Sequence, residues 1–155
     1  SILISQLSFQ VERMCFMDIA QKLREEGYKV TPQRIAIYNV LYAENNHPTA
    51  EMIYQSLRED HPSMSLATVY KTMEIFERIG LVRVLDLGDD CSRYDWDTRN
   101  HPHVRCTMCN RINDLHDVQV NCLREEVARH SEYEITGLHV SFEGICPECL
   151  RKSSH

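Results

Sequence analysis

Two cysteine pairs with identical spacing constrain this chain more than any other feature. Cys106 and Cys109 form the first pair, and Cys146 and Cys149 form the second, each with two residues between the cysteines. Two such turns present four sulfur atoms, the tetrahedral ligand set of a closed structural zinc site. A zinc ion there would join the two ends of a domain of about 55 residues, a size at which metals commonly stabilise folds. Two independent redox pairs are the alternative.

The composition limits the compartment and the partners. Seven cysteines in a chain without a recognisable signal peptide predict a reducing, cytoplasmic setting, with metal or redox chemistry rather than disulfides. No segment approaches the roughly 20 apolar residues of a membrane span, so no membrane partner is expected. The net charge of −6 comes mainly from the second half, since residues 1–85 hold nine basic and ten acidic residues. Any DNA contact must therefore use a local patch or two patches of a dimer.

The first half of the chain has the pattern of helices followed by a hairpin. Residues 1–16 are expected to be a tail or an extra helix, and residues 17–97 a winged helix-turn-helix domain. Helices are predicted to start at Thr31-Pro32, after Thr49 and after Ser65. The third has an inward stripe at Leu66, Val69, Met73 and Phe76, which leaves Thr68, Lys71 and Thr72 outside it.

Segments 81–87 and 93–96, with a turn at residues 88–90, predict a β-hairpin that serves as the wing. The third long helix would then read DNA. A generic helical bundle with a hairpin is the alternative. Residues 98–155 predict a small α/β domain, with strands at 112–115 and 134–142 around a helix at 118–130. The fold class is therefore α+β.

A second metal site is predicted between the hairpin and the first cysteine pair. Side chains alternate along a strand, so His101 and His103 point the same way. Asp95 and Asp114 lie on neighbouring predicted strands, and His47 precedes a proline in the helical half. Imidazole and carboxylate donors suit Fe(II), Mn(II) or Zn(II). Surface histidines are the alternative, and the remaining histidines are interpreted as surface or packing residues: His61, His116, His130, His139 and His155.

Five motifs in register resemble the ferric uptake regulator family. They are HPTAEMIY at 47–54, SLATVYK at 65–71, SRYD at 92–95, HPH at 101–103 and the two cysteine pairs. The resemblance covers residues from about 18 to 150. It implies a homodimeric, metal-dependent repressor that binds double-stranded operator DNA. It also implies an N-terminal winged helix, a C-terminal α/β dimerisation domain with structural Zn(II) on the four cysteines, and regulatory Fe(II) or Mn(II) at the hinge.

The resemblance also assigns individual residues. The regulatory ligands would be His47, Asp95, His101, His103 and Asp114. Tyr70 and Lys71 match positions that touch DNA in relatives, while Thr68 and Arg34 would contact the phosphate backbone. In peroxide-sensing members, bound Fe(II) reacts with hydrogen peroxide and a histidine ligand is oxidised; the matching targets are His47 and His101.

Peroxide sensors are the favoured branch because iron-uptake regulators typically carry glutamates where this chain has Asp95 and Asp114. Pro102 and Leu138 replace two ligands of a further sensory site found in many iron-uptake regulators, whereas Lys71 is closer to the iron type. Iron uptake, with Fe(II) as corepressor, is the first alternative, followed by zinc, manganese or nickel sensing. A zinc-ribbon adaptor or a redox protein are the alternatives of a different class. An enzyme is not expected, because no nucleophile and base stand together.

Overall fold

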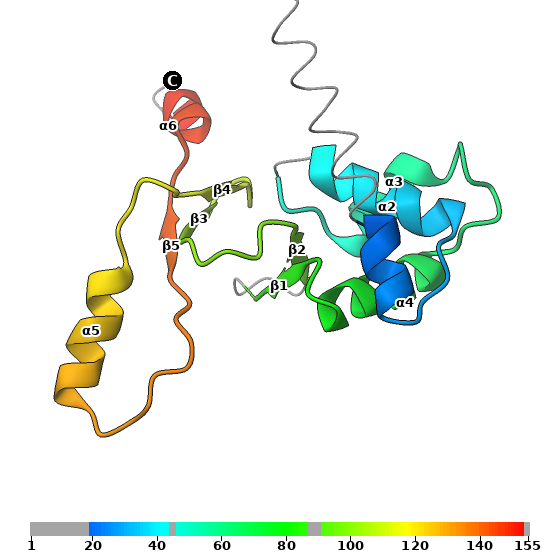
Figure 1. The fold of residues 1–155 in the computed structure, drawn as a ribbon. Helices are drawn as coiled ribbons and strands as arrows, with labels where there is room; N and C mark the ends of the chain where they lie inside the picture. Colours follow the sequence, from blue (N-terminus) through cyan, green and yellow to red (C-terminus); the bar gives the residue numbers. More distant parts are fainter. Residues whose placement is uncertain (1–18, 44–45, 87–90, 154–155) are drawn as a thin grey trace, which may run out of the picture. The chain divides into compact units, whose positions relative to one another are not determined.

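The computed structural model describes residues 19–43, 46–86 and 91–153. The expected tail at residues 1–16 and the expected turn at residues 88–90 lie outside these ranges. The chain divides into two compact units, with the boundary between Thr98 and Arg99. We call them unit 1 and unit 2 and describe each by itself (Figure 1). Among the described residues, no helix is long and apolar enough to cross a membrane.

Unit 1 is a small helical bundle followed by a hairpin. After helical residues 19–25, its elements are α2 (Pro32–Ala43), α3 (Ala50–Leu57), α4 (Leu66–Arg78), β1 (Arg83–Leu85) and β2 (Arg93–Asp95). The side chain of Thr49 accepts the backbone N–H of Met52, and that of Ser65 accepts the backbone N–H of Thr68. These bonds satisfy amides that a helix start leaves without partners, as the sequence predicted.

The core of unit 1 fixes which face of α4 remains exposed. Val69, Met73 and Phe76 are buried, as the apolar spacing predicts, while Leu66 is only partly buried. Thr72 was expected outside the stripe but is buried, because it lies between the buried positions on a helix packed by α2 and α3. Tyr70 and Lys71 stay exposed. β1 and β2 follow α4 in the chain and pair antiparallel, so the predicted winged helix-turn-helix is confirmed.

Unit 2 is built on a three-stranded sheet. Its elements are β3 (His103–Cys106), β4 (Ile112–Asp114), α5 (Asn121–His130), β5 (Ser141–Gly144) and α6 (Pro147–Ser153). The strand order is β4-β3-β5, with β3–β4 antiparallel and β3–β5 parallel. In Figure 1, α5 extends away from the strands of this unit. The α/β character of the second half, and with it the α+β class, is confirmed.

Two boundaries in unit 2 differ from the sequence prediction. The helix expected over residues 118–130 begins at Asn121. The strand expected over residues 134–142 is confined to Ser141–Gly144. A strand is stable only where its backbone groups have partners, and β3 offers just four residues, which pair with residues 141–144.

Candidate metal centres and DNA-reading helix

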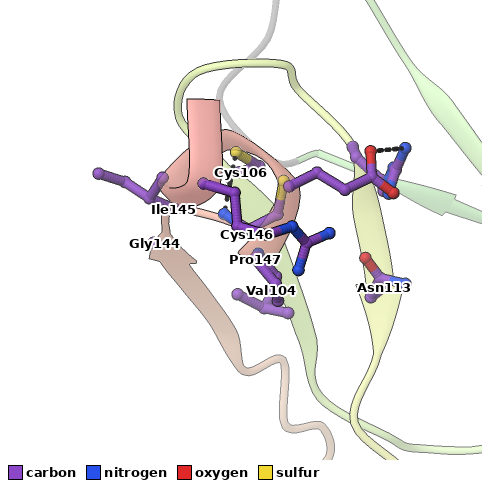
Figure 2. A pocket seen from close by; sticks show the side chains of 10 residues that line it. Val104, Cys106, Asn113, Gly144, Ile145, Cys146 and Pro147 are labelled. Atoms are coloured by element: carbon purple, nitrogen blue, oxygen red, sulfur yellow. Dashed lines mark hydrogen bonds and ion pairs between the residues drawn. The ribbon is translucent and has the colours of Figure 1, made fainter. Parts of the chain in front are cut away.

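The four cysteines of unit 2 converge on one point. One sulfur from each of Cys106, Cys109, Cys146 and Cys149 lies within 4.8 Å of the others. Cys106 ends β3, and Cys109 follows it in the turn. Cys146 lies between β5 and α6, and Cys149 lies in α6. Figure 2 shows Cys106 and Cys146 beside the pocket bounded by Val104, Asn113 and Pro147. The sulfur set therefore has the composition of a structural zinc site.

The thiols of this cluster are electrostatically coupled. The backbone N–H of Cys146 donates to the Cys106 sulfur at 3.3 Å, and such backbone bonds lower the pKa of the Cys106 thiol to about 6. The pKa of Cys149 is raised to about 12, first through its hydrogen bond with Cys146 and then through burial. Four adjacent thiolates require a compensating positive charge, which a divalent metal ion supplies.

An ion pair connects the second cysteine pair to the sheet. Arg111 donates from Nη1 and Nη2 to the two carboxylate oxygens of Glu148, at 2.8 and 2.9 Å. This forked contact links the start of α6 to the residue before β4. It lowers the pKa of Glu148 and raises that of Arg111. Both groups are exposed, so its role is orientation more than stability.

Three of the five predicted regulatory ligands come together in unit 2. The Nε2 atoms of His101 and His103 lie 3.0 and 3.2 Å from the same oxygen, Oδ1 of Asp114. The register of β3 against β4 causes this, because it places His103 opposite Asp114. His101 and His103 also face each other, with ring centroids 4.5 Å apart.

The orientation of His101 tests whether these residues fit a metal ion. Its Nδ1 lies 2.8 Å from the backbone oxygen of Arg99. A carbonyl only accepts, so Nδ1 carries the proton of this bond and the neutral ring has a lone pair at Nε2. In that form the lone pair faces Asp114 Oδ1 at 3.0 Å, and because both atoms are acceptors, a proton or a metal ion can bind between them. A backbone bond behind the ring is also how metal-ligating histidines are usually held. The donor set fits a divalent first-row metal ion.

The other two predicted ligands come together in unit 1. His47 Nδ1 lies 3.7 Å from Asp95 Oδ1, and both side chains are buried. Donor atoms that bind one ion at about 2.1 Å commonly stand about 3 to 4 Å apart. The backbone N–H of Tyr94 donates to Pro48 at 3.1 Å, so β2 is joined to the loop that carries His47. That loop turns sharply, since His47 has a left-handed φ of 50°.

The predicted DNA contacts lie on two helices of unit 1. Thr68, Tyr70 and Lys71 are on α4, where Thr68 is half-buried and bonded to Ser65. The Tyr70 hydroxyl donates to the Glu51 carboxylate on α3, a contact that raises the pKa of Tyr70 to about 12. Arg34, on α2, bonds the Lys29 carbonyl and lies over the Tyr28 ring. Sequence reasoning missed Glu51 because nothing in its spacing marks a partner nineteen residues away.

The chain joins a winged helix-turn-helix to an α/β unit, and that unit carries a four-cysteine cluster and a histidine–aspartate cluster. This combination defines the class of metal-dependent transcriptional repressors. The ferric uptake regulator family matches residues 25–143. A peroxide-responsive repressor of Staphylococcus saprophyticus is 40% identical over 136 residues, which are 87% of this chain and 91% of that protein. The chain therefore belongs to the ferric uptake regulator family.

Solved structures agree with this assignment. A ferric uptake regulator of Helicobacter pylori, described as having three functional metal-binding sites, has the same fold, with a TM-score of 0.76 at 22% identity over 88% of this chain and 93% of its own. A repressor of Streptococcus pyogenes described in terms of peroxide sensing and gene regulation is 33% identical, with a TM-score of 0.51 over 86% of this chain and 92% of its own.

Proposed function

We propose that this chain is a homodimeric repressor that binds operator DNA with a metal ion as corepressor and releases it after oxidation by hydrogen peroxide. The observation that carries the proposal is the convergence of His101 and His103 on one oxygen of Asp114. Similarity to peroxide-responsive repressors supports the choice of signal. The setting would be the cytoplasm.

The proposal divides the metal chemistry between two kinds of site. Cys106, Cys109, Cys146 and Cys149 would hold structural Zn(II), which their all-sulfur composition favours. The mixed imidazole and carboxylate set would hold Fe(II) or Mn(II), which prefer nitrogen and oxygen donors. The second set comprises His47, Asp95, His101, His103 and Asp114.

The division of the regulatory ligands between two units supplies the switch. Unit 1 carries His47 and Asp95, while unit 2 carries the other three ligands. A metal ion that uses all five ligands binds only one relative orientation of the units. Its binding free energy therefore selects that orientation, which is a population shift. The selected orientation would present α4 to the major groove, with Thr68, Tyr70 and Lys71 toward DNA and Arg34 toward the backbone.

The surface of unit 2 supports the homodimer. None of the residues 121–130 in α5 is buried, yet Leu123 and Val127 are apolar and one helical turn apart. β5 is an edge strand on which Phe142 is also exposed. An exposed apolar helix face and an open strand edge are both features that a second copy of the same unit can cover. Two copies would also give the acidic chain two DNA-reading helices.

Peroxide sensing would use the buried histidines as sacrificial groups. Bound Fe(II) supplies the redox chemistry that activates hydrogen peroxide. The net change adds one oxygen atom to an imidazole carbon of His47 or His101 and releases one water molecule, so peroxide is reduced by two electrons. An oxidised ring is a poorer donor, so the two units lose their common ligand set. The iron-uptake alternative keeps the same ligands without this oxidation.

Metal-dependent DNA binding is the first expected result. The zinc-loaded protein should bind its own promoter about 5–150-fold more tightly with Mn(II) than without it, the usual range of allosteric coupling. Fluorescence anisotropy at constant salt measures this ratio. His103→Asn should remove the Mn(II) effect, while His139→Asn, at an exposed histidine of unit 2 outside α5, should leave it intact. If Mn(II), Fe(II) and Zn(II) all fail to promote specific binding there and at related operators, the repressor proposal is wrong.

Histidine oxidation is the second expected result. After brief exposure of the Fe(II)-loaded protein to low peroxide, peptides containing His47 or His101 should gain one oxygen atom, and operator affinity should fall to that of the metal-free protein. The Mn(II)-loaded protein should be unchanged, as tandem mass spectrometry will show. Asp114→Glu should reduce oxidation while preserving metal-dependent DNA binding. Modified cysteines with intact histidines would show that the sensing chemistry is different.

A further inference from the structure

His116 stands beside the metal ligands of unit 2, although sequence reasoning leaves it on the surface. Its Nε2 lies 3.6 Å from Oδ2 of Asp114. Its ring centroid is 4.8 Å from that of His101, with the two planes at 40°. The carboxylate of Asp114 is thus met by two imidazoles at one oxygen and by a third at the other.

The backbone of unit 2 holds His116 in this place. Immediately before it, the Leu115 N–H donates to the Pro102 carbonyl at 2.9 Å, which ties the end of β4 to the segment between His101 and His103. Immediately after it, the Val118 N–H donates to the Leu115 carbonyl at 3.2 Å and closes a turn. His116 therefore faces the same carboxylate because of two backbone contacts within unit 2.

Three imidazoles and one carboxylate are sufficient donors for a divalent ion. Tetrahedral zinc sites and open iron or manganese sites use three or four ligands of these types. The four side chains come from β3, β4 and the residues beside them, so they need no contribution from unit 1. Burial differs within the set: the His101 and His103 side chains are 5% and 4% exposed, whereas that of His116 is 55% exposed.

We propose that His116 is a metal ligand, and that with His101, His103 and Asp114 it forms a capture site for a divalent cation inside unit 2. The inference rests on the proposed function, because three of the four donors also belong to the proposed regulatory set. His116 is the solvent-facing member and meets the hydrated cation first. The ion is thereby held by unit 2 alone, without a donor from unit 1.

The test is a Co(II) titration of the full-length, zinc-loaded chain, followed by ligand-field absorption and native mass spectrometry. The variant His47→Asn with Asp95→Asn removes the donors of unit 1. It should still bind one Co(II) per chain in addition to zinc. Adding His116→Asn to this background should weaken that binding at least about tenfold, as expected for loss of a group that tunes a metal site. His139→Asn, at another exposed histidine of unit 2, is the matched control and should change nothing.

The outcomes separate this inference from the proposed function. Suppose that the unaltered chain binds the second Co(II), but that neither the unit 1 double variant nor His47→Asn alone does. The capture site is then wrong, and the five-ligand site stands. If His116→Asn leaves Co(II) affinity and spectrum unchanged in the double-variant background, His116 is not a ligand. If the unaltered chain binds no Co(II) beyond its zinc site, both proposals fail. Circular dichroism checks that each variant is folded.

Discussion

Replacing Cys149 with serine is expected to abolish zinc binding and the cooperative unfolding of unit 2. Small zinc domains are commonly unfolded without their metal, because the binding free energy of the ion is also their folding free energy. The fold of unit 2 depends strongly on the zinc ion, because its sheet has three short strands and its longest helix contributes no buried residue among the described positions. Zinc per chain should fall from one to none, and operator binding should disappear with it.

Elemental analysis, thermal circular dichroism and size-exclusion chromatography measure these effects. Cys122→Ser is the matched control, because Cys122 is an exposed thiol on α5, outside the cluster. It should retain zinc, the unfolding transition and DNA binding. A Cys149→Ser protein that keeps one zinc ion and an unchanged melting curve would contradict the structural role of the four cysteines. Acid should mimic the substitution, because protonated thiols do not bind the ion.

Val127→Asp is expected to convert the dimer into monomers and to weaken operator binding by about 10² to 10⁴-fold. Val127 is 48% exposed on the apolar face of α5 and lies outside the buried core, so an aspartate there would place a charge in the proposed interface. Without the partner, the second DNA contact is no longer intramolecular, and its avidity is lost. Analytical ultracentrifugation and fluorescence anisotropy with a two-half-site operator measure the two effects.

Asn121→Asp provides the control for charge. It adds the same negative charge to α5, on the side opposite Leu123 and Val127. It should remain dimeric and bind DNA normally. The core of unit 1 is formed by other residues, so the melting temperature of unit 1 should be the same in Val127→Asp as in the unaltered chain. A Val127→Asp protein that stays dimeric at micromolar concentration would place the interface elsewhere on unit 2.

Local signals predicted much of unit 1. Helix starts at Thr49 and Ser65 follow from short-range hydrogen bonds, and the exposed face of α4 follows from apolar spacing. The burial of Thr72 could not be predicted from that spacing. A polar residue inside a helix is buried when neighbouring helices close over it, and their positions are set by tertiary packing.

The sequence predicted some of the candidate metal ligands more directly than others. Paired cysteines identify their own cluster, because the spacing contains the geometry. The grouping of His101, His103 and Asp114 came from the resemblance to the family, because the pairing of β3 with β4 was not predicted from the pattern. The position of His116 could not be predicted from the sequence. Its approach to Asp114 depends on the hydrogen bond from the Leu115 N–H to the Pro102 carbonyl, and no residue pattern predicts that bond. β5 was misplaced because its partner strand, rather than its own composition, decides its length.

β3 has His103 as its first residue and Cys106 as its last. The two positions are three steps apart, about 10 Å along an extended backbone. Substitutions in the cysteine cluster and in the histidine cluster are therefore not independent variables. Their free-energy effects are expected to be non-additive where a substitution shifts the backbone of β3, because such a shift reaches both clusters. Selection for a new metal preference at the histidines will therefore give interpretable results only in a background whose sulfur cluster is intact and filled.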